Sequence, residues 1–298
     1  MSQEFLHSDN PRRTEGMEDS VREFWNAVQE SFGEDARRVL QLVKERGNVI
    51  VLGPHRIGKS EAFKPQLQKM AEQDGYRVGI SSGLEHGFME NQINMDVLGM
   101  NEEQWQHETA PKLLIVDEAL RMIENLDEAS AKEIILEVFS SLRQTHTSSV
   151  LMIATKSKRD REEEAERWGA LAQELNISTA VHQLESIHIS KDVVRKLLES
   201  WGAQDDLIDF FLADQNQTLR TVGVMDKFLS AFEYGRVPPF QTLENLRGYL
   251  RKNENYREWP KYHYIGGSKG DWFAMIKNLV VVSDDELESW RGTIPDYD

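Results

Sequence analysis

The stretch from Asn48 to Ser60 constrains the fold more than any other part of the chain. Its first half is the apolar run Val49–Leu52, in which three of the four residues are β-branched. The run leads directly into Gly-Pro-His-Arg-Ile-Gly-Lys-Ser. A short β-branched run predicts a buried strand, and the Gly-x-x-x-x-Gly-Lys-Ser pattern after it predicts a phosphate-binding loop with a helix beginning at Lys59.

Each residue type in this loop suits the phosphates of a nucleotide. Gly53 and Gly58 allow the backbone to curl, so that successive N–H groups can point at phosphate oxygens. The Lys59 ammonium would neutralise the β- and γ-phosphates, and the Ser60 hydroxyl would be a ligand of Mg²⁺. The predicted nucleotide-binding residues are the whole loop: Gly53, Pro54, His55, Arg56, Ile57, Gly58, Lys59 and Ser60.

A second apolar run, Lys112–Val116, ends in the carboxylates Asp117 and Glu118. At the carboxyl end of a strand, Asp117 could hold the water shell of Mg²⁺ opposite Ser60. Glu118 could then polarise an attacking water as a general base. The loop and the acidic pair together predict a hydrolase of nucleoside triphosphates that uses Mg²⁺.

Composition bounds the class of protein. The chain has 298 residues, which predicts a core domain with smaller additions. The absence of cysteine excludes disulfides, thiol nucleophiles and thiolate zinc sites. A formal charge of −16 argues against nucleic-acid binding over the whole surface but leaves a local basic patch open. The sequence has no apolar run of about 20 residues and no secretory signal. We therefore expect a cytoplasmic location and no membrane partner.

Strand and helix signals alternate along the chain. This alternation predicts an α/β fold, a three-layer P-loop NTPase core whose five-stranded parallel sheet binds ligands at the carboxyl ends of its strands. The remaining strands are expected at 76–81, 148–154 and near Leu184–Ile189, and a periodic helix at 131–142.

Four regions are expected from these signals. Residues 1–16 are polar and predict a flexible arm. Residues 17–189 hold the nucleotide-binding domain, including a weakly patterned insertion. Three helical patterns follow Ser190, so 190–235 are expected to form a small helical domain. The region 236–298 is a C-terminal extension of unknown fold, which begins near a Pro-Pro pair and contains one convincing helix.

A five-strand P-loop core, a polar residue after the fourth strand and a helical bundle after the fifth together resemble the AAA+ superfamily. The loop resembles that of the archaeal-type AAA+/STAND ATPases, relatives of origin-recognition initiators and transposition helper ATPases, although His55 stands where arginine is commoner. The resemblance covers about residues 33–233. It implies that the helical domain is a lid, that Thr155 is the sensor-1 residue that helps to orient the attacking water, and that Arg220 is the sensor-2 arginine that reaches the γ-phosphate. A surface arginine is the alternative for Arg220.

The resemblance also implies a homo-oligomer or a partner protein, to which an arginine finger could be donated from the region between the fourth and fifth strands. Arg159, Arg161 and Arg167 are the candidates there. The adjacent run of three glutamates, 162–164, instead favours a solvated, salt-bridged helix for each of them.

The preferred function is Mg²⁺-dependent ATP binding and hydrolysis that switches a conformation or an assembly on a partner protein or nucleic-acid complex. The alternatives are a nucleotide-loaded regulatory scaffold with negligible turnover and a P-loop kinase. Nucleic acid could be contacted through residues 243–264, where basic and aromatic residues are interleaved but glutamates dilute the charge.

Overall fold

The computed structural model describes residues 15–54, 57–82, 107–119, 129–130, 132–133, 135–136, 142, 146–155, 158–185, 187–233 and 241–253. The chain divides into two compact units, one of them Gln29–Glu185 and the other Met1–Val28 together with Ser186–Asp298. Residues 17–28, which the sequence places in the nucleotide-binding domain, therefore group with the helices that follow the sheet. Most of the expected arm and insertion, and much of the C-terminal extension, lie outside the described residues.

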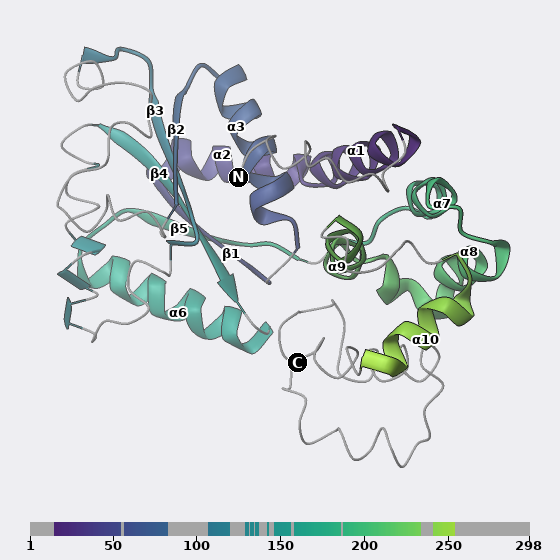
Figure 1. Cartoon of the computed structure of the whole chain (residues 1–298). Helices are drawn as coiled ribbons and strands as arrows, with labels where there is room; N and C mark the ends of the chain where they lie inside the picture. Colours follow the sequence, from purple (N-terminus) through teal and green to yellow (C-terminus); the bar gives the residue numbers. More distant parts are fainter. Residues whose placement is uncertain are drawn as a thin grey trace. The chain divides into compact units, whose positions relative to one another are not determined.

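The first unit is built on a five-stranded sheet in which every pair of neighbouring strands is parallel. The strand order is β2-β3-β4-β1-β5 (Figure 1). The strands are β1 (Asn48–Pro54), β2 (Arg77–Ser82), β3 (Lys112–Asp117), β4 (Thr147–Thr155) and β5 (Thr179–Gln183). This architecture confirms the predicted α/β fold with a five-stranded parallel sheet.

Helices cover both faces of this sheet. Alternate strand residues such as Ile50, Leu114 and Leu151 pack in one cluster with Trp168 of α6 (Lys158–Glu174), and all four are buried. Their neighbours along each strand point to the opposite face. Figure 1 shows α2 (Gly33–Arg46) and α3 (Lys64–Gln73) on the side opposite α6. Burial on both faces explains why the central strands are almost continuously apolar.

The register of the strands gathers the predicted site residues at one edge. Pro54 at the end of β1 lies opposite Thr155 at the end of β4. Asp117 at the end of β3 lies opposite Ser82 of β2. Because all five strands are parallel, their carboxyl ends share this edge, as the sequence predicts.

The prediction of the fifth strand at Leu184–Ile189 is wrong, since β5 is formed by Thr179–Gln183. β5 lies at the edge of the sheet and most of its residues are only half-buried, so they show no apolar run. Leu184 and Ile189 are buried, which explains the misleading apolar signal. The Leu184 N–H still donates to the Leu52 carbonyl at 2.7 Å, directly after the strand.

The second unit is helical in its described part. Its helices are the N-terminal part of α1 (Glu15–Ser31), α7 (Lys191–Ser200), α8 (Asp205–Leu212), a 3-10 helix (Asp214–Arg220), α9 (Val222–Glu233) and α10 (Leu243–Asn253). Ser190 caps α7, since its hydroxyl accepts a hydrogen bond from the Val193 N–H at 3.4 Å. Gly202, at a φ of 75°, follows the end of that helix.

One further helix prediction can be compared with the described residues. Within the predicted helix at 131–142, the described positions are helical, and Ile135 and Leu142 are buried. No helix among the described residues combines the length and the apolar character needed to cross a membrane.

Candidate active site

The loop after β1 has the curled backbone that its glycines predict. Gly58 has a φ of 92°, a left-handed conformation that glycine adopts at no steric cost. A π-helical turn follows at Lys59–Phe63, and the N–H groups of Ala62 and Phe63 both donate to the Gly58 carbonyl, at 2.8 and 2.9 Å. The two residues at the tip of the loop, His55 and Arg56, lie outside the described residues.

Gly53 is required for a different reason, namely close packing. A Cβ atom added at this position would lie 3.0 Å from Cδ1 of Ile57 and 3.1 Å from Cβ of Leu184. It would also lie 3.5 Å from Cδ of Lys59. The absence of a side chain therefore lets the loop and the segment after β5 close against the end of β1.

The Lys59 ammonium lies inside the curl of the loop. Its Nζ atom donates to the carbonyl oxygens of Gly53 at 2.8 Å and Pro54 at 2.5 Å, and the residue is only 8% exposed. Burial lowers the pKa of Lys59 from its ordinary 10.5 to about 7, although the nearby carboxylates of Asp117 and Glu118 oppose this shift. Its hydrogen-bond partners in the loop are neutral carbonyls, and a phosphate bound there would supply an anion to pair with the ammonium.

Asp117 is engaged through both oxygens. It is 7% exposed. Its Oδ1 atom accepts a hydrogen bond from the Glu118 N–H at 3.0 Å, and its Oδ2 atom lies 2.7 Å from Nζ of Lys64, the first residue of α3. Nothing in the sequence pattern marked Lys64, because its partner lies 53 residues away.

Glu118 has a strained backbone at the end of β3. Its φ is 51°, a left-handed conformation that costs a non-glycine residue about 1–2 kcal/mol. Its side chain is half-buried. Backbone strain of this kind is concentrated at functional sites, where the surrounding structure holds a side chain in a required position. The conformation is consistent with a catalytic use of this carboxylate.

Thr155 places a buried hydroxyl at the end of β4. The residue is fully buried, and its Oγ1 atom has no hydrogen-bond partner among the described residues. An unpaired buried hydroxyl costs about 1–3 kcal/mol. The site is therefore suited to a water or ligand oxygen that would pair with Thr155, and a sensor-1 role remains a prediction.

The oxygen atoms of this site fit Mg²⁺. The described residues contain no group of three or more His, Asp and Glu side chains that could hold a metal ion by themselves. Mg²⁺ is usually bound by one or two protein oxygens together with waters and substrate phosphates. The buried carboxylate of Asp117 and the half-buried hydroxyl of Ser60 are a donor set of this kind.

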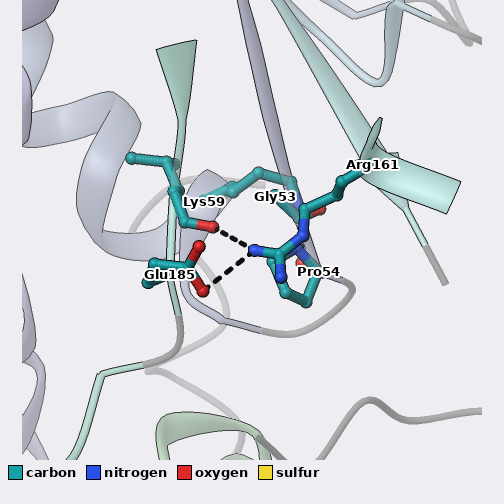
Figure 2. A network of polar contacts seen from close by, with 6 residues as sticks. Gly53, Pro54, Lys59, Arg161 and Glu185 are labelled. Atoms are coloured by element: carbon teal, nitrogen blue, oxygen red, sulfur yellow. Dashed lines mark hydrogen bonds and ion pairs between the residues drawn. The ribbon is translucent and has the colours of Figure 1, made fainter. Parts of the chain in front are cut away.

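Arg161 is one of the candidate arginine fingers, but its burial beside Lys59 was not predicted from the sequence. It is 1% exposed, and its Nη1 atom donates to the Leu184 carbonyl at 2.8 Å and to Oε2 of Glu185 at 3.1 Å (Figure 2). Its positive charge lies close enough to Lys59 to lower the pKa of that residue further. The interpretation of Arg161 as part of a solvated helix face is therefore wrong.

A helical-spacing signal could have identified Arg161. It precedes the buried Trp168 by seven residues, so the two share the face of α6 that packs on the sheet. Arg167 behaves as the glutamate run predicts, since it is exposed and pairs with Glu164 at 3.3 Å. The side chain of Arg159 lies outside the described residues.

Arg220 is not the surface arginine that was the alternative to a sensor-2 role. It ends the 3-10 helix before α9 and is 7% exposed. Its Nη1 atom donates to the carbonyls of Phe211 at 2.8 Å and Ala213 at 3.0 Å, which ties α8 to the residues after it. The sensor-2 contact with a γ-phosphate remains a prediction, but Arg220 also has a structural function inside the helical unit.

The parallel sheet, the curled loop and the acidic pair define a P-loop NTPase fold. No known protein family's sequence profile matches the chain, and no curated protein sequence matches it. Solved structures do show similarity. Cdc6p from Pyrobaculum aerophilum is 10% identical with a TM-score of 0.44, covering 88% of this chain and 84% of its own.

Two other structures are similar at the same level. AMPPCP-bound DnaA from Aquifex aeolicus is 14% identical with a TM-score of 0.42, covering 86% of this chain and 84% of its own. The Walker-type ATPase PABY2304 of Pyrococcus abyssi is 13% identical with a TM-score of 0.40, covering 86% of both chains. Of these three structures, the second is named as bound to AMPPCP and the third as a Walker-type ATPase. At such low scores, we base the function on the geometry of the site alone.

The pKa of Lys59 leads to a prediction about stability. Because this pKa is lowered in the folded protein, the unfolded chain binds more protons between about pH 7 and pH 10.5, and stability should rise with pH in that window. Urea unfolding of the nucleotide-free protein should show a free energy of unfolding that is greater at about pH 9 than at about pH 7, by on the order of 2 kcal/mol. Lys59→Met should remove most of that gain. An equal gain in the variant would show that other groups cause it.

Arg161 and Arg167 form a matched pair on one helix. Arg161→Met should lower the free energy of unfolding by about 1–3 kcal/mol, because the buried Leu184 carbonyl loses its donor. Arg167→Met removes only an exposed ion pair and should change it by less than about 1 kcal/mol. Urea denaturation of both variants tests the difference, and equal effects would contradict a structural role for Arg161.

Proposed function

We propose that this protein binds ATP with Mg²⁺ and hydrolyses it. The proposal depends chiefly on one observation, the burial of the Lys59 ammonium in the curled loop beside the charges of Asp117 and Glu118. A buried cation with a lowered pKa is unfavourable by itself and becomes favourable when an anion binds. The curled loop offers backbone N–H groups and the positive end of a helix to the same anion.

Each site residue has a defined task in this proposal. The loop residues and Lys59 bind the phosphates, and Ser60 and Asp117 hold the metal ion. Mg²⁺, when bound, supplies positive charge that neutralises the phosphate oxygens. Glu118 accepts the proton of the attacking water, and Thr155 helps to orient that water.

Hydrolysis would act as a switch. If a conformation or assembly contacts ATP and ADP differently, its population changes when the bound ATP is hydrolysed to ADP. A homo-oligomer or a partner protein and a cytoplasmic location are the settings that we expect. Nucleic-acid contact through residues 243–264 also remains a prediction, and the second half of that region, 254–264, lies outside the described residues. Of its basic residues, Arg247 already stacks over the Phe210 ring at 5.7 Å.

A nucleotide-loaded scaffold is the second candidate. The observation in its favour is the ion pair between Lys64 and Asp117, because it occupies the carboxylate that a metal ion needs. Steady-state release of phosphate from ATP separates the two functions. Sustained release that depends on Mg²⁺ supports the hydrolase, and binding without release supports the scaffold.

Two substitutions separate binding from chemistry. Lys59→Ala should abolish tight ATP binding, because the phosphates lose the ammonium buried in the loop. Glu118→Gln should retain binding and slow hydrolysis by about 10²-fold or more, the usual scale of general-base catalysis. Calorimetry measures the first effect and phosphate release the second. Hydrolysis at the parent rate in Glu118→Gln would exclude Glu118 as the base.

Arg220 requires two measurements. Arg220→Gln should lower the free energy of unfolding by about 1–3 kcal/mol, because two backbone carbonyls lose a buried donor. If Arg220 also contacts the γ-phosphate, the ratio of ATP to ADP affinity should fall about tenfold or more. Calorimetry with both nucleotides measures that ratio. A loss of stability with an unchanged ratio would leave Arg220 with its structural function alone.

A further inference from the structure

The ion pair between Lys64 and Asp117 differs from the surface ion pairs of the same unit. The nitrogen and oxygen atoms lie 2.7 Å apart, and the two side chains are 19% and 9% exposed. The pair between Lys44 and Asp74 has a similar distance, 2.9 Å, but its side chains are 54% and 42% exposed. Water therefore screens the Lys44 pair and largely does not screen the Lys64 pair.

The location of Lys64 connects it to the proposed metal site. It follows Ser60 by four residues, which places it one helical turn further along the segment that begins in the loop. Ser60 and Asp117 are the two residues that we assign to Mg²⁺. Lys64 thus brings a cation of the protein itself to the carboxylate that a metal ion would use.

Both oxygens of Asp117 already have donors. The Glu118 N–H occupies Oδ1, and the Lys64 ammonium occupies Oδ2. The backbone donor is fixed by the strand, whereas the lysine side chain can rotate away. A metal-bound water could therefore donate a hydrogen bond to Oδ2 only in competition with Lys64.

We propose that Lys64 is an internal counter-ion of the Mg²⁺ site, which neutralises Asp117 when no metal is bound and withdraws when Mg²⁺ enters with the nucleotide. The proposal depends on the proposed function in one respect, the assignment of Asp117 to Mg²⁺. Lys64 then has two opposite effects. It stabilises the nucleotide-free protein, because a buried carboxylate without a partner is strongly unfavourable. It also weakens metal binding, because the ion pair must open first.

A purely structural ion pair would behave differently. Its loss would destabilise the protein whether or not metal is present, and metal affinity would stay the same or fall. The counter-ion proposal instead requires that metal ions compensate for the loss of Lys64 and bind more tightly without it. The two possibilities therefore differ in the sign of the effect on metal affinity.

The test compares Lys64→Met with Lys44→Met, the variant of the exposed pair. Thermal unfolding without nucleotide is measured in EDTA and in millimolar Mg²⁺. We expect Lys64→Met to be less stable than the parent protein in EDTA and to recover much of that loss in Mg²⁺, because the ion takes the place of the ammonium. The parent and Lys44→Met should respond little to Mg²⁺.

Metal affinity is the second measurement. Mn²⁺ serves as the probe, and electron paramagnetic resonance measures its binding to the protein with saturating ADP. Loss of a competing charged hydrogen bond should raise the affinity of Lys64→Met about tenfold or more. Lys44→Met should bind Mn²⁺ as the parent does. An unchanged or lower affinity in Lys64→Met overturns the proposal.

A third variant distinguishes failure of this proposal from failure of the proposed function. Asp117→Asn should weaken Mn²⁺ binding in the ADP complex if Asp117 belongs to the metal site. If it does so while Lys64→Met has no effect, only the counter-ion proposal is wrong. If Asp117→Asn has no effect, the assignment of Asp117 is wrong and both fail. Should Lys64→Met not fold, Lys64→Gln keeps a hydrogen-bond donor without the charge and must raise Mn²⁺ affinity as well.

Discussion

The buried ammonium of Lys59 is the interaction on which the candidate site depends. Its nitrogen donates to the carbonyls of Gly53 and Pro54, the last two residues of β1, so the lysine returns to the strand that precedes it. Gly58 turns the chain in a left-handed conformation, and Gly53 lets Ile57 and Leu184 pack closely against the end of β1, where the lysine binds. The curl of the loop and the packing around its glycines therefore determine together where the buried charge lies.

The sheet determines what surrounds that charge. β1 lies between β4 and β5, and β3 lies beside β4, so the acidic pair and Thr155 reach the edge at which the loop begins. The site carries costs that a stable protein would otherwise avoid, namely the left-handed backbone of Glu118 and the hydroxyl of Thr155, which has no hydrogen-bond partner in the part of the chain that the structure describes. Local costs of this kind are expected where function, rather than stability, selects the residue.

The sequence predicted those features whose cause is local. The run before Gly53 predicts a buried strand because β1 is covered on both faces, and the glycine spacing predicts the loop because backbone freedom is a property of the residue itself. The fifth strand was misplaced because its residues are half-exposed at a sheet edge, where no apolar run is needed. The following buried residues, Leu184 and Ile189, supplied the stronger signal.

The basic residues show where local reasoning ends. Lys64 pairs with a carboxylate 53 residues away, and Arg161 binds the Leu184 carbonyl 23 residues away. Neither partner can be predicted from charge patterning, which considers only neighbours along the same helix. For Arg161 the adjacent glutamates indicated solvent, whereas the packing of the helix on the sheet decided its burial.

The burial of these cations also bears on how a chain with a formal charge of −16 could bind the polyphosphate that we propose as its ligand. Fields from exposed charges fall off over about 8 Å at physiological ionic strength, so the acidic surface acts weakly on a buried loop. Buried charges are screened much less. Lys59 and Arg161 are almost fully buried and Lys64 is mostly so, and the carboxylate of Asp117 is buried beside them, so the charges of the candidate site are few and largely withdrawn from water. If the proposed function is correct, phosphate binding depends on these few buried charges, and the net charge of the chain gives little information about the ligand.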